Sequence, residues 1–204
     1  MTEPPRVALV AGAARGIGAA TVTALAAGGW RVMAVDRCAD DPALPYPLGR
    51  RAELAKVAAD AGLDVAIAVA GVIAGGVPAW EVPPGQEQAV LDIDLGGVLN
   101  LARVAVPALL RRPEPRHGRF IAVASAAATR GLPMLAAYCA AKAGVAGFVR
   151  ALATELRGTG VTANAVSPGS TATVILDESA RLYGLPSAEA FAAQQPPQPA
   201  AGSR

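Results

Sequence analysis

The chain has 204 residues, 53% of them hydrophobic and 17% charged, which is enough for one domain with a sizeable core. The formal net charge is +2 and no basic run is longer than a pair, which argues against binding to nucleic acid or a membrane surface. Two cysteines are too few for a disulfide framework or a metal site, and the first residues lack a signal-peptide layout. We therefore expect a cytoplasmic protein without a metal.

The first predicted element is a buried strand over residues 6–11, with the apolar sequence RVALVA. A glycine-rich turn follows it, and the next residues, to about position 27, predict a helix. In a strand–turn–helix unit, glycines let the backbone approach a pyrophosphate, which binds the amides at the start of the helix. A plain strand-to-helix turn is the alternative. The pattern predicts a nucleotide site formed by Gly12, Arg15, Gly16, Ile17 and Gly18.

The second predicted strand covers residues 30–35 and is followed by Asp36. This acid lies 18 residues after Gly18, close to the spacing of about 20 at which an acid binds the ribose hydroxyls of a dinucleotide. A carboxylate there repels a 2′-phosphate, so we expect NAD rather than NADP, although the neighbouring Arg37 is a residue type that accepts that phosphate. The alternative is an aspartate that caps the next turn.

A proline-punctuated loop over residues 38–48 precedes the rest of the pattern. The further predicted elements are a helix over 51–61, a strand over 63–70, a loop over 72–85, a helix over 86–111 that Pro107 kinks or breaks, a strand over 119–124, a helix over 134–157, a strand over 161–166 and helical pieces over 174–193. This order predicts a doubly wound parallel α/β sheet of about five strands, in one domain over residues 1–193 with a disordered tail over 194–204. Right-handed crossovers place the helix over 51–61 on the face opposite the first helix.

Three residues of types that take part in catalysis follow the fourth predicted strand. Ser125 comes directly after it, and Tyr138 and Lys142 are four residues apart on the next helix, so they share one face. A lysine beside a phenol favours the phenolate and lowers its pKa, which makes a tyrosine a candidate general acid or base. An ordinary helix surface is the alternative. Each of the five predicted strands is followed by a candidate residue, namely Gly12, Asp36, Gly71, Ser125 and Pro168-Gly169. In a parallel sheet such strand ends meet in one crevice.

The residues Gly12-x-x-x-Gly16-x-Gly18, Asp36, Ala70-Gly71, Ser125, Tyr138-x-x-x-Lys142 and Asn164-x-x-x-Pro168-Gly169 with Thr173 occur in this order. Together they resemble the short-chain dehydrogenase/reductase family, over residues 6 to about 193. The resemblance implies a Rossmann-like fold and hydride transfer between NAD and a secondary alcohol or ketone. It implies that Tyr138 exchanges the proton, that Ser125 stabilises the substrate oxygen, and that Lys142 lowers the Tyr138 pKa and binds the nicotinamide ribose. It also implies further cofactor contacts from Ala70, Gly71, Pro168, Gly169, Thr171 and Thr173, and a homo-oligomer.

Several features depart from the family pattern. Asp94 stands where the family has a catalytic asparagine, and we expect it to stabilise Lys142 while competing for it. Only 35 residues separate Asp36 from Gly71, which suggests an internal deletion of one strand and one helix, so that Asp60 or Asp64 only approximates the usual adenine contact. The chain also lacks the family's last helix and strand, which suggests a truncated C-terminus.

Two further expectations concern partners. The loop over residues 38–48 resembles that of the mycofactocin-coupled subgroup, in which a tightly held NAD passes electrons to a peptide-derived acceptor. Residues 175–193 are apolar, which favours a hydrophobic small-molecule substrate, with plain core packing as the alternative. Because of the missing elements, two other readings stay open: a catalytically impaired nucleotide-binding or interaction protein that keeps the pocket, and a remnant that folds poorly.

Overall fold

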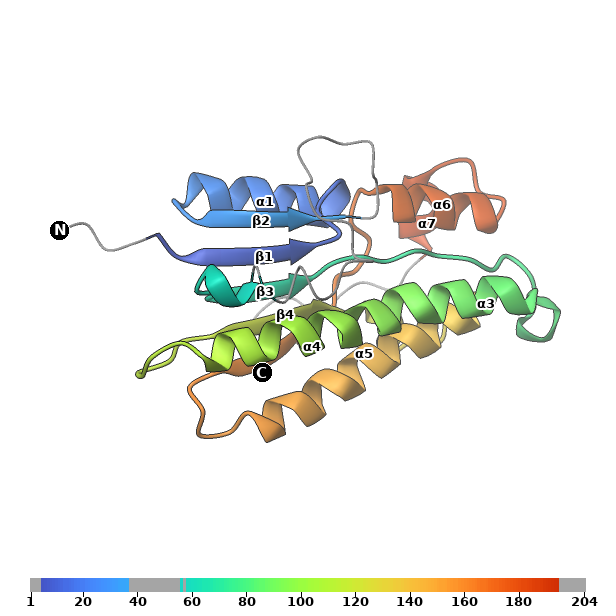
Figure 1. Ribbon diagram of the computed structural model, residues 1–204. Coiled ribbons are helices and arrows are strands. Elements are labelled where there is room, and N and C mark those ends of the chain that lie inside the picture. The colour runs from blue at the N-terminus through green and yellow to red at the C-terminus, as the bar shows by residue number, and fades with distance from the viewer. Residues whose placement is uncertain (1–4, 37–55, 57, 195–204) are drawn as a thin grey trace.

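The computed structural model of the chain describes residues 5–36, 56 and 58–194 (Figure 1). These residues form one parallel sheet with the strand order β2-β1-β3-β4-β5. The strands are β1 (Val7–Ala11), β2 (Arg31–Val35), β3 (Val65–Ala68), β4 (Arg119–Val123) and β5 (Thr162–Val166). The predicted doubly wound parallel sheet of about five strands is confirmed. Arg37, the loop over 38–48 and the tail over 195–204 lie outside the described residues.

Helices cover both faces of the sheet (Figure 1). The helix α1 (Gly16–Ala27) lies on one face, and α4 (Gly97–Leu110) and α5 (Ala136–Glu155) lie on the other. The short helix α3 (Pro84–Val90) leads into α4, and α6 (Val174–Leu182) and α7 (Ala188–Ala193) lie beyond the end at which the strands finish. Residues 58–60 are helical, and Ala58 is buried in the cluster formed with α4 and α5, which confirms the predicted crossover for this part.

The burial of β1 explains why the strands are continuous apolar runs rather than alternating ones. Val7, Leu9 and Ala11 pack into the cluster on the α4 and α5 side, whereas Ala8 and Val10 pack into the cluster on the α1 side. Successive side chains of a strand point to opposite faces, so a strand covered by helices on both faces needs apolar residues at every position.

The helix α5, which carries Tyr138 and Lys142, is oriented by its apolar stripe. Its buried residues recur at intervals of three and four, which is the spacing of one helix face: Tyr138, Ala141, Lys142, Val145, Val149 and Leu152. Val145, Val149 and Leu152 pack this face against the sheet. Tyr138 and Lys142 lie earlier on the same face and therefore point toward the ends of the strands.

The predicted helix over 86–111 differs from the observed one. The observed helix begins at Pro84, and it is interrupted by a π-helical segment at Leu91–Gly96 rather than by a break at Pro107. Pro107 lies inside α4, on its exposed side, and the helix continues past it to Leu110. The run Pro84–Leu110 has the length and hydropathy of a membrane-crossing helix, but in this fold α4 packs its apolar stripe on the sheet.

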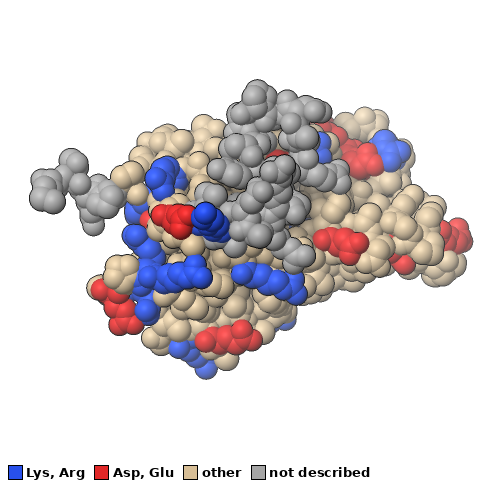
Figure 2. All heavy atoms as spheres, viewed as in Figure 1, with Lys and Arg blue, Asp and Glu red and all other residues tan. Residues whose placement is uncertain are grey.

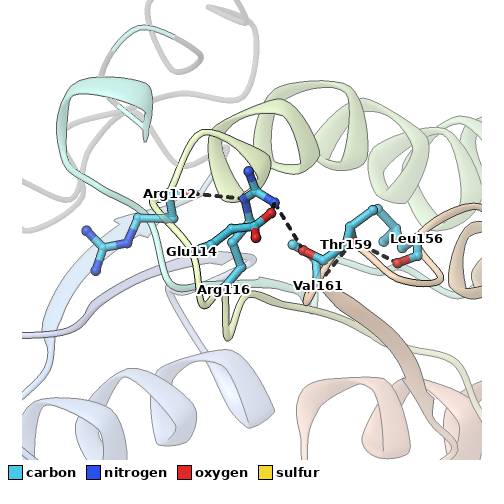
Figure 3. Close-up of polar contacts among 6 residues, drawn as sticks. All are labelled: Arg112, Glu114, Arg116, Leu156, Thr159 and Val161. Atoms are coloured by element: carbon cyan, nitrogen blue, oxygen red, sulfur yellow. Dashed lines mark hydrogen bonds and ion pairs between the residues drawn. The ribbon is translucent and has the colours of Figure 1, made fainter.

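A polar network closes the opposite end of the sheet, where the strands begin. On the face shown in Figure 2, most Lys and Arg side chains lie over this half of the molecule. Arg116 joins the turn after α4 to the turn before β5, because its Nε donates to the Arg112 carbonyl at 2.9 Å and its guanidinium donates to the Thr159 carbonyl at 3.4 Å (Figure 3). Asp64 accepts from the Val7 amide at 2.7 Å and pairs with Arg112 at 2.9 Å. Asp64 is therefore at the wrong end of the sheet to contact adenine, contrary to our expectation.

Candidate active site

A cavity of about 640 Å³ lies along the ends at which the strands finish. The residues of the sequence prediction that line it are Gly12, Arg15, Gly16, Ile17, Asp36, Ala70, Gly71, Ser125, Tyr138, Lys142, Pro168, Gly169, Thr171 and Thr173. Gly18 and Asp94 are buried behind this wall, and Arg37 lies outside the described residues. In the described part of the chain, no three His, Cys, Asp or Glu side chains are grouped to hold a metal ion.

The glycine turn is packed too closely for side chains. Gly12 has a φ of +86°, and a Cβ there would lie 2.3 Å from the amide nitrogen of Ala70. A Cβ on Gly18 would lie 1.9 Å from the carbonyl oxygen of Gly12. The first turn of α1 therefore packs directly on the end of β1, and Gly12, Gly16 and Ile17 line the cavity there. A backbone cradle of this kind at a helix start fits the pyrophosphate of a dinucleotide.

We expect Gly12→Ala to lower the free energy of unfolding by about 1–3 kcal/mol and to weaken nucleotide binding, because the new methyl group collides with Ala70 in a left-handed backbone conformation. Thermal unfolding and nucleotide titration measure the two effects. Gly29→Ala is the matched control, since Gly29 has a φ of +78° but nothing within 4 Å of its Cβ position. Equal losses in the two variants would show that the close approach to Ala70 is unimportant.

Asp36 fixes the same turn from the end of β2. Its Oδ2 accepts a hydrogen bond from the Ala14 amide at 2.9 Å, and the amides of Gly12 and Ala13 donate to the Val35 carbonyl. The carboxylate therefore caps the glycine turn, which lies 22 residues earlier, and it also lines the cavity next to the glycines. The turn after Asp36, which the alternative interpretation has it cap, lies outside the described residues. One residue stabilises the glycine turn and gives a negative charge to this end of the cavity.

Ser125 is held by contacts between two neighbouring strand ends. The amide of Ala126 donates to the Pro168 carbonyl at 3.0 Å, which joins the segment after β4 to the segment after β5. The Ser125 hydroxyl accepts from the Ala127 amide at 3.1 Å and also forms a hydrogen bond with Tyr138. The serine and the phenol therefore present both hydroxyls to the same part of the cavity.

Lys142 forms a buried ion pair with Asp94. Its Nζ lies 3.3 Å from Asp94 Oδ2 and donates to the Val123 carbonyl at 3.2 Å, and the two residues are 3% and 0% exposed. Asp94 Oδ1 accepts from the Val72 amide at 2.7 Å. A Cβ on Gly71 would lie 3.2 Å from Nζ, so glycine at this position leaves the pair its space.

The pKa of Tyr138 is raised, and the predicted lowering by Lys142 is wrong for this structure. Burial is the main cause, the hydrogen bond with Ser125 opposes it, and the charges of Asp94 and Cys139 raise the pKa further. Lys142 lies over the ring, with Nζ 5.6 Å from its centroid, while its ammonium group contacts Asp94. Burial also raises the pKa of Asp94, against the effects of Lys142 and the Val72 amide.

Sequence reasoning missed the groups that complete this centre. The carbonyl of Val123 and the amide of Val72 are backbone atoms, so no residue pattern identifies them. Leu132, Leu135 and Arg130 also line the cavity, from the segment between Ser125 and α5. The only sequence signal for them is their position between two site residues.

Fold and site together define a nucleotide-binding oxidoreductase of the Rossmann type, with a glycine cradle at one end of the cavity and a serine–tyrosine–lysine set in its centre. The sequence profile of the family described as short chain dehydrogenase matches residues 6–182. The chain belongs to the short-chain dehydrogenase/reductase family.

Individual relatives agree with this assignment. The chain is 42% identical to the 2-dehydro-3-deoxy-L-rhamnonate dehydrogenase (NAD(+)) of Sphingomonas sp. strain SKA58, over 57% of this chain and 45% of that protein. It is 38% identical to the short-chain reductase protein NovJ of Streptomyces niveus, over 87% of this chain and 74% of that protein. A crystal structure from Beutenbergia cavernae with NADP bound at low occupancy has a TM-score of 0.73 at 33% identity, over 86% of this chain and 76% of that chain. The chain thus spans less than half of the first of these relatives and about three quarters of the other two.

Proposed function

We propose that the protein transfers a hydride between NAD and a secondary alcohol or ketone. The observation that carries the proposal is the meeting of Ser125, Tyr138 and Lys142 in the cavity that also contains the glycine turn and Asp36. The complete set of three residues favours an enzyme over a non-catalytic binding protein. The proposal is tested by reduction of a ketone with NADH, measured as the loss of absorbance of the reduced cofactor, and by oxidation of an alcohol with free NAD or with an artificial electron acceptor. Absence of turnover in all of these assays, with every alcohol and ketone offered, would refute it.

The residues of the chain have separate tasks in this reaction. In ketone reduction Tyr138 donates its proton to the substrate oxygen, and in alcohol oxidation it accepts that proton. Ser125 donates a hydrogen bond to the same oxygen and stabilises the charge that develops on it. The glycine turn and Asp36 hold the nucleotide, and Lys142 lies on the side of Tyr138 that faces Gly71. Bound NAD supplies the hydride acceptor, and its reduced form the donor.

The preference for NAD over NADP is part of the proposal and depends on Asp36. We expect Asp36→Asn to raise the ratio of NADP to NAD affinity by about tenfold or more, because like charges placed together cost several kcal/mol at a binding site. Asparagine keeps an oxygen that accepts from the Ala14 amide, so the turn itself is preserved. Titration with both cofactors measures the ratio. Asp177→Asn, an exposed change on α6, is the control, and an unchanged ratio in Asp36→Asn would contradict the assignment.

We also propose an apolar substrate. The part of the cavity beyond Ser125 and Tyr138 is lined mainly by aliphatic and aromatic side chains, namely Leu132, Leu135, Ile175, Leu176 and Phe191, with Arg130 and Ser179 as polar members. Burial of apolar surface favours a hydrocarbon-rich ketone over a sugar. Comparison of kcat/KM for a cyclic terpene ketone and a sugar alcohol of similar size tests this.

The coupling to a mycofactocin-type electron acceptor is a separate proposal, supported by the sequence of residues 38–48. If it is right, the purified protein retains nicotinamide cofactor and oxidises alcohols with an artificial electron acceptor rather than with free NAD. A nucleotide-free protein that turns over free NAD would exclude the coupling while leaving the dehydrogenase activity in place.

We further propose that the protein is cytoplasmic and forms a homo-oligomer. Light scattering of the purified protein tests the oligomeric state.

A further inference from the structure

The segment over residues 174–193, which we call the lid, forms part of the wall of the cavity. It consists of α6 and α7 and lies beyond the strand ends (Figure 1). Ile175, Leu176 and Ser179 line the cavity from α6, and Phe191 lines it from α7. Access of a substrate to Tyr138 therefore depends on how firmly the lid is fastened to the rest of the site.

Tyr183, directly after α6, fastens the lid without lining the cavity. Its hydroxyl donates a hydrogen bond to the carbonyl of Pro133. Its ring packs edge-on against Phe191, with centroids 5.1 Å apart and an interplanar angle of 68°, so the two halves of the lid are joined at the same point. Burial raises the pKa of Tyr183, so the hydroxyl keeps the proton that it donates.

The acceptor lies on the turn that begins the catalytic helix. Pro133 precedes Met134, which has a φ of 59°, a conformation that a residue other than glycine keeps only when its surroundings hold it there. The carbonyl of Met134 accepts from the Gly76 amide at 3.0 Å, and Leu135, which is 1% exposed, directly precedes α5. Tyr138 follows in the first turn of that helix.

Three segments that are distant in sequence therefore meet at one place: the loop after β3, the turn before α5 and the end of α6. Leu182 and Tyr183 pack against the same buried cluster that contains Leu135 and Tyr138. A change in the position of the lid thus reaches the turn that carries the catalytic helix through direct contacts.

We propose that Tyr183 is a positioning residue, whose hydroxyl fastens the lid to the Pro133–Met134 turn and so couples closure over the substrate to the start of the catalytic helix. The proposal deepens the proposed function and rests on it for the identity of the substrate pocket. The fastening itself is a property of the protein without substrate, so it can be tested whether or not the enzyme is active.

The test compares Tyr183→Phe with Arg181→Ala. The first keeps the ring against Phe191 and removes only the hydroxyl, whereas the second removes an exposed ion pair with Glu178 on the same helix. Amide hydrogen exchange is measured on the full chain without added ligand. We expect exchange at Gly184, Leu185 and Gly76 to become about three- to tenfold faster in Tyr183→Phe, which is the effect of losing one hydrogen bond, and to stay unchanged in Arg181→Ala.

Gly76 decides between coupling and a local effect. Its amide bonds to Met134 and lies outside the lid, so faster exchange there shows that the turn loosens together with the lid. Unchanged exchange at Gly76, or unchanged exchange in the lid, would overturn the proposal.

Kinetics give a second readout on the same variants. We expect Tyr183→Phe to raise the KM of the alcohol or ketone by about three- to tenfold, with a smaller change in kcat and no change in NAD affinity. A partly unfolded variant would instead lose kcat at constant KM, which would count against a positioning role. If the exchange pattern appears but wild-type protein turns over no substrate, the role of Tyr183 stands and the proposed function fails. If wild-type protein is active but the exchange pattern is absent, the role of Tyr183 fails and the proposed function stands.

Discussion

Tyr138→Phe is expected to lower kcat by a factor of about 100 to 10,000, which is the contribution of a positioned general acid or base. The phenol is the group of this site that both hydrogen-bonds with Ser125 and lies in the buried part of the cavity. Phenylalanine keeps the ring packed against Val90, Leu135 and Ala141, so the fold and the nucleotide end of the cavity are preserved. Steady-state kinetics with saturating NAD measure the loss.

Two controls belong with this variant. Its melting temperature and its affinity for NAD should match those of the wild type, because only one hydroxyl is removed. Ser125→Ala removes the neighbouring hydroxyl and should lower kcat by a factor of about 100 to 1,000, the effect of losing one donor to the developing charge. Retention of wild-type kcat in Tyr138→Phe would eliminate the tyrosine as the proton-transfer group.

Asp94→Asn is expected to raise turnover at neutral pH by roughly fivefold, as an electrostatic interaction of about 1 kcal/mol gives. In the wild type the carboxylate contacts the Lys142 ammonium and raises the pKa of Tyr138. Removing that charge frees the ammonium and lowers the pKa of the phenol. The rate of alcohol oxidation, measured between neutral and alkaline pH, reports the change.

The direction of the pH dependence follows from the state of the phenol. Alcohol oxidation needs Tyr138 deprotonated, so with a raised pKa the rate increases with pH into the range above the ordinary phenol value. Ketone reduction needs the protonated phenol and is therefore insensitive to pH through neutrality. In Asp94→Asn the rising limb of oxidation should move to lower pH, and a limb that stays in place or moves upward would contradict this account.

The same variant should be less stable than the wild type. Loss of one partner of a buried ion pair leaves the other charge uncompensated, which costs about 3–5 kcal/mol. The single carbonyl oxygen of asparagine can serve either the Val72 amide or Lys142, but not both as the carboxylate does. Asp92→Asn is the matched control: it is the same chemical change in the same π-helical segment, but its carboxylate is exposed and bonds to Gln88. Thermal unfolding of both variants separates the loss of the pair from the loss of charge.

Most of the fold followed from local patterns in the chain. The strands are short apolar runs bounded by polar residues or glycine, and their helical crossovers left one reasonable topology. The spacing of Tyr138 and Lys142 on one helix face predicted that both would face the same cavity, and both do. These features depend on the period of a helix or a strand, which a sequence displays directly.

The pairing of Lys142 with Asp94 was expected from the family pattern and is present, but local periodicity does not indicate how Asp94 is directed toward the lysine. A π-helical segment adds no apolar periodicity of its own, so Leu91–Gly96 looked like ordinary helix while it set the direction of Asp94. The contact between Tyr183 and Pro133 joins residues 50 positions apart and depends on the path of the lid. Asp64 was considered for the adenine contact by its spacing from Asp36 and Gly71, but it precedes β3 and therefore lies at the end of the sheet where the strands begin.

The close pairing of Lys142 with Asp94 has a consequence for the reach of the lysine. An isolated positive charge acts over long distances in a dry interior, but a neutral pair 3.3 Å apart acts as a small dipole, whose potential falls with the square of the distance and changes sign across the pair. The acidity of the phenol then depends on the orientation of that dipole relative to Tyr138, and not only on how near the ammonium lies. In two chains with the same tyrosine and lysine, the pKa of the tyrosine can therefore be raised in one and lowered in the other.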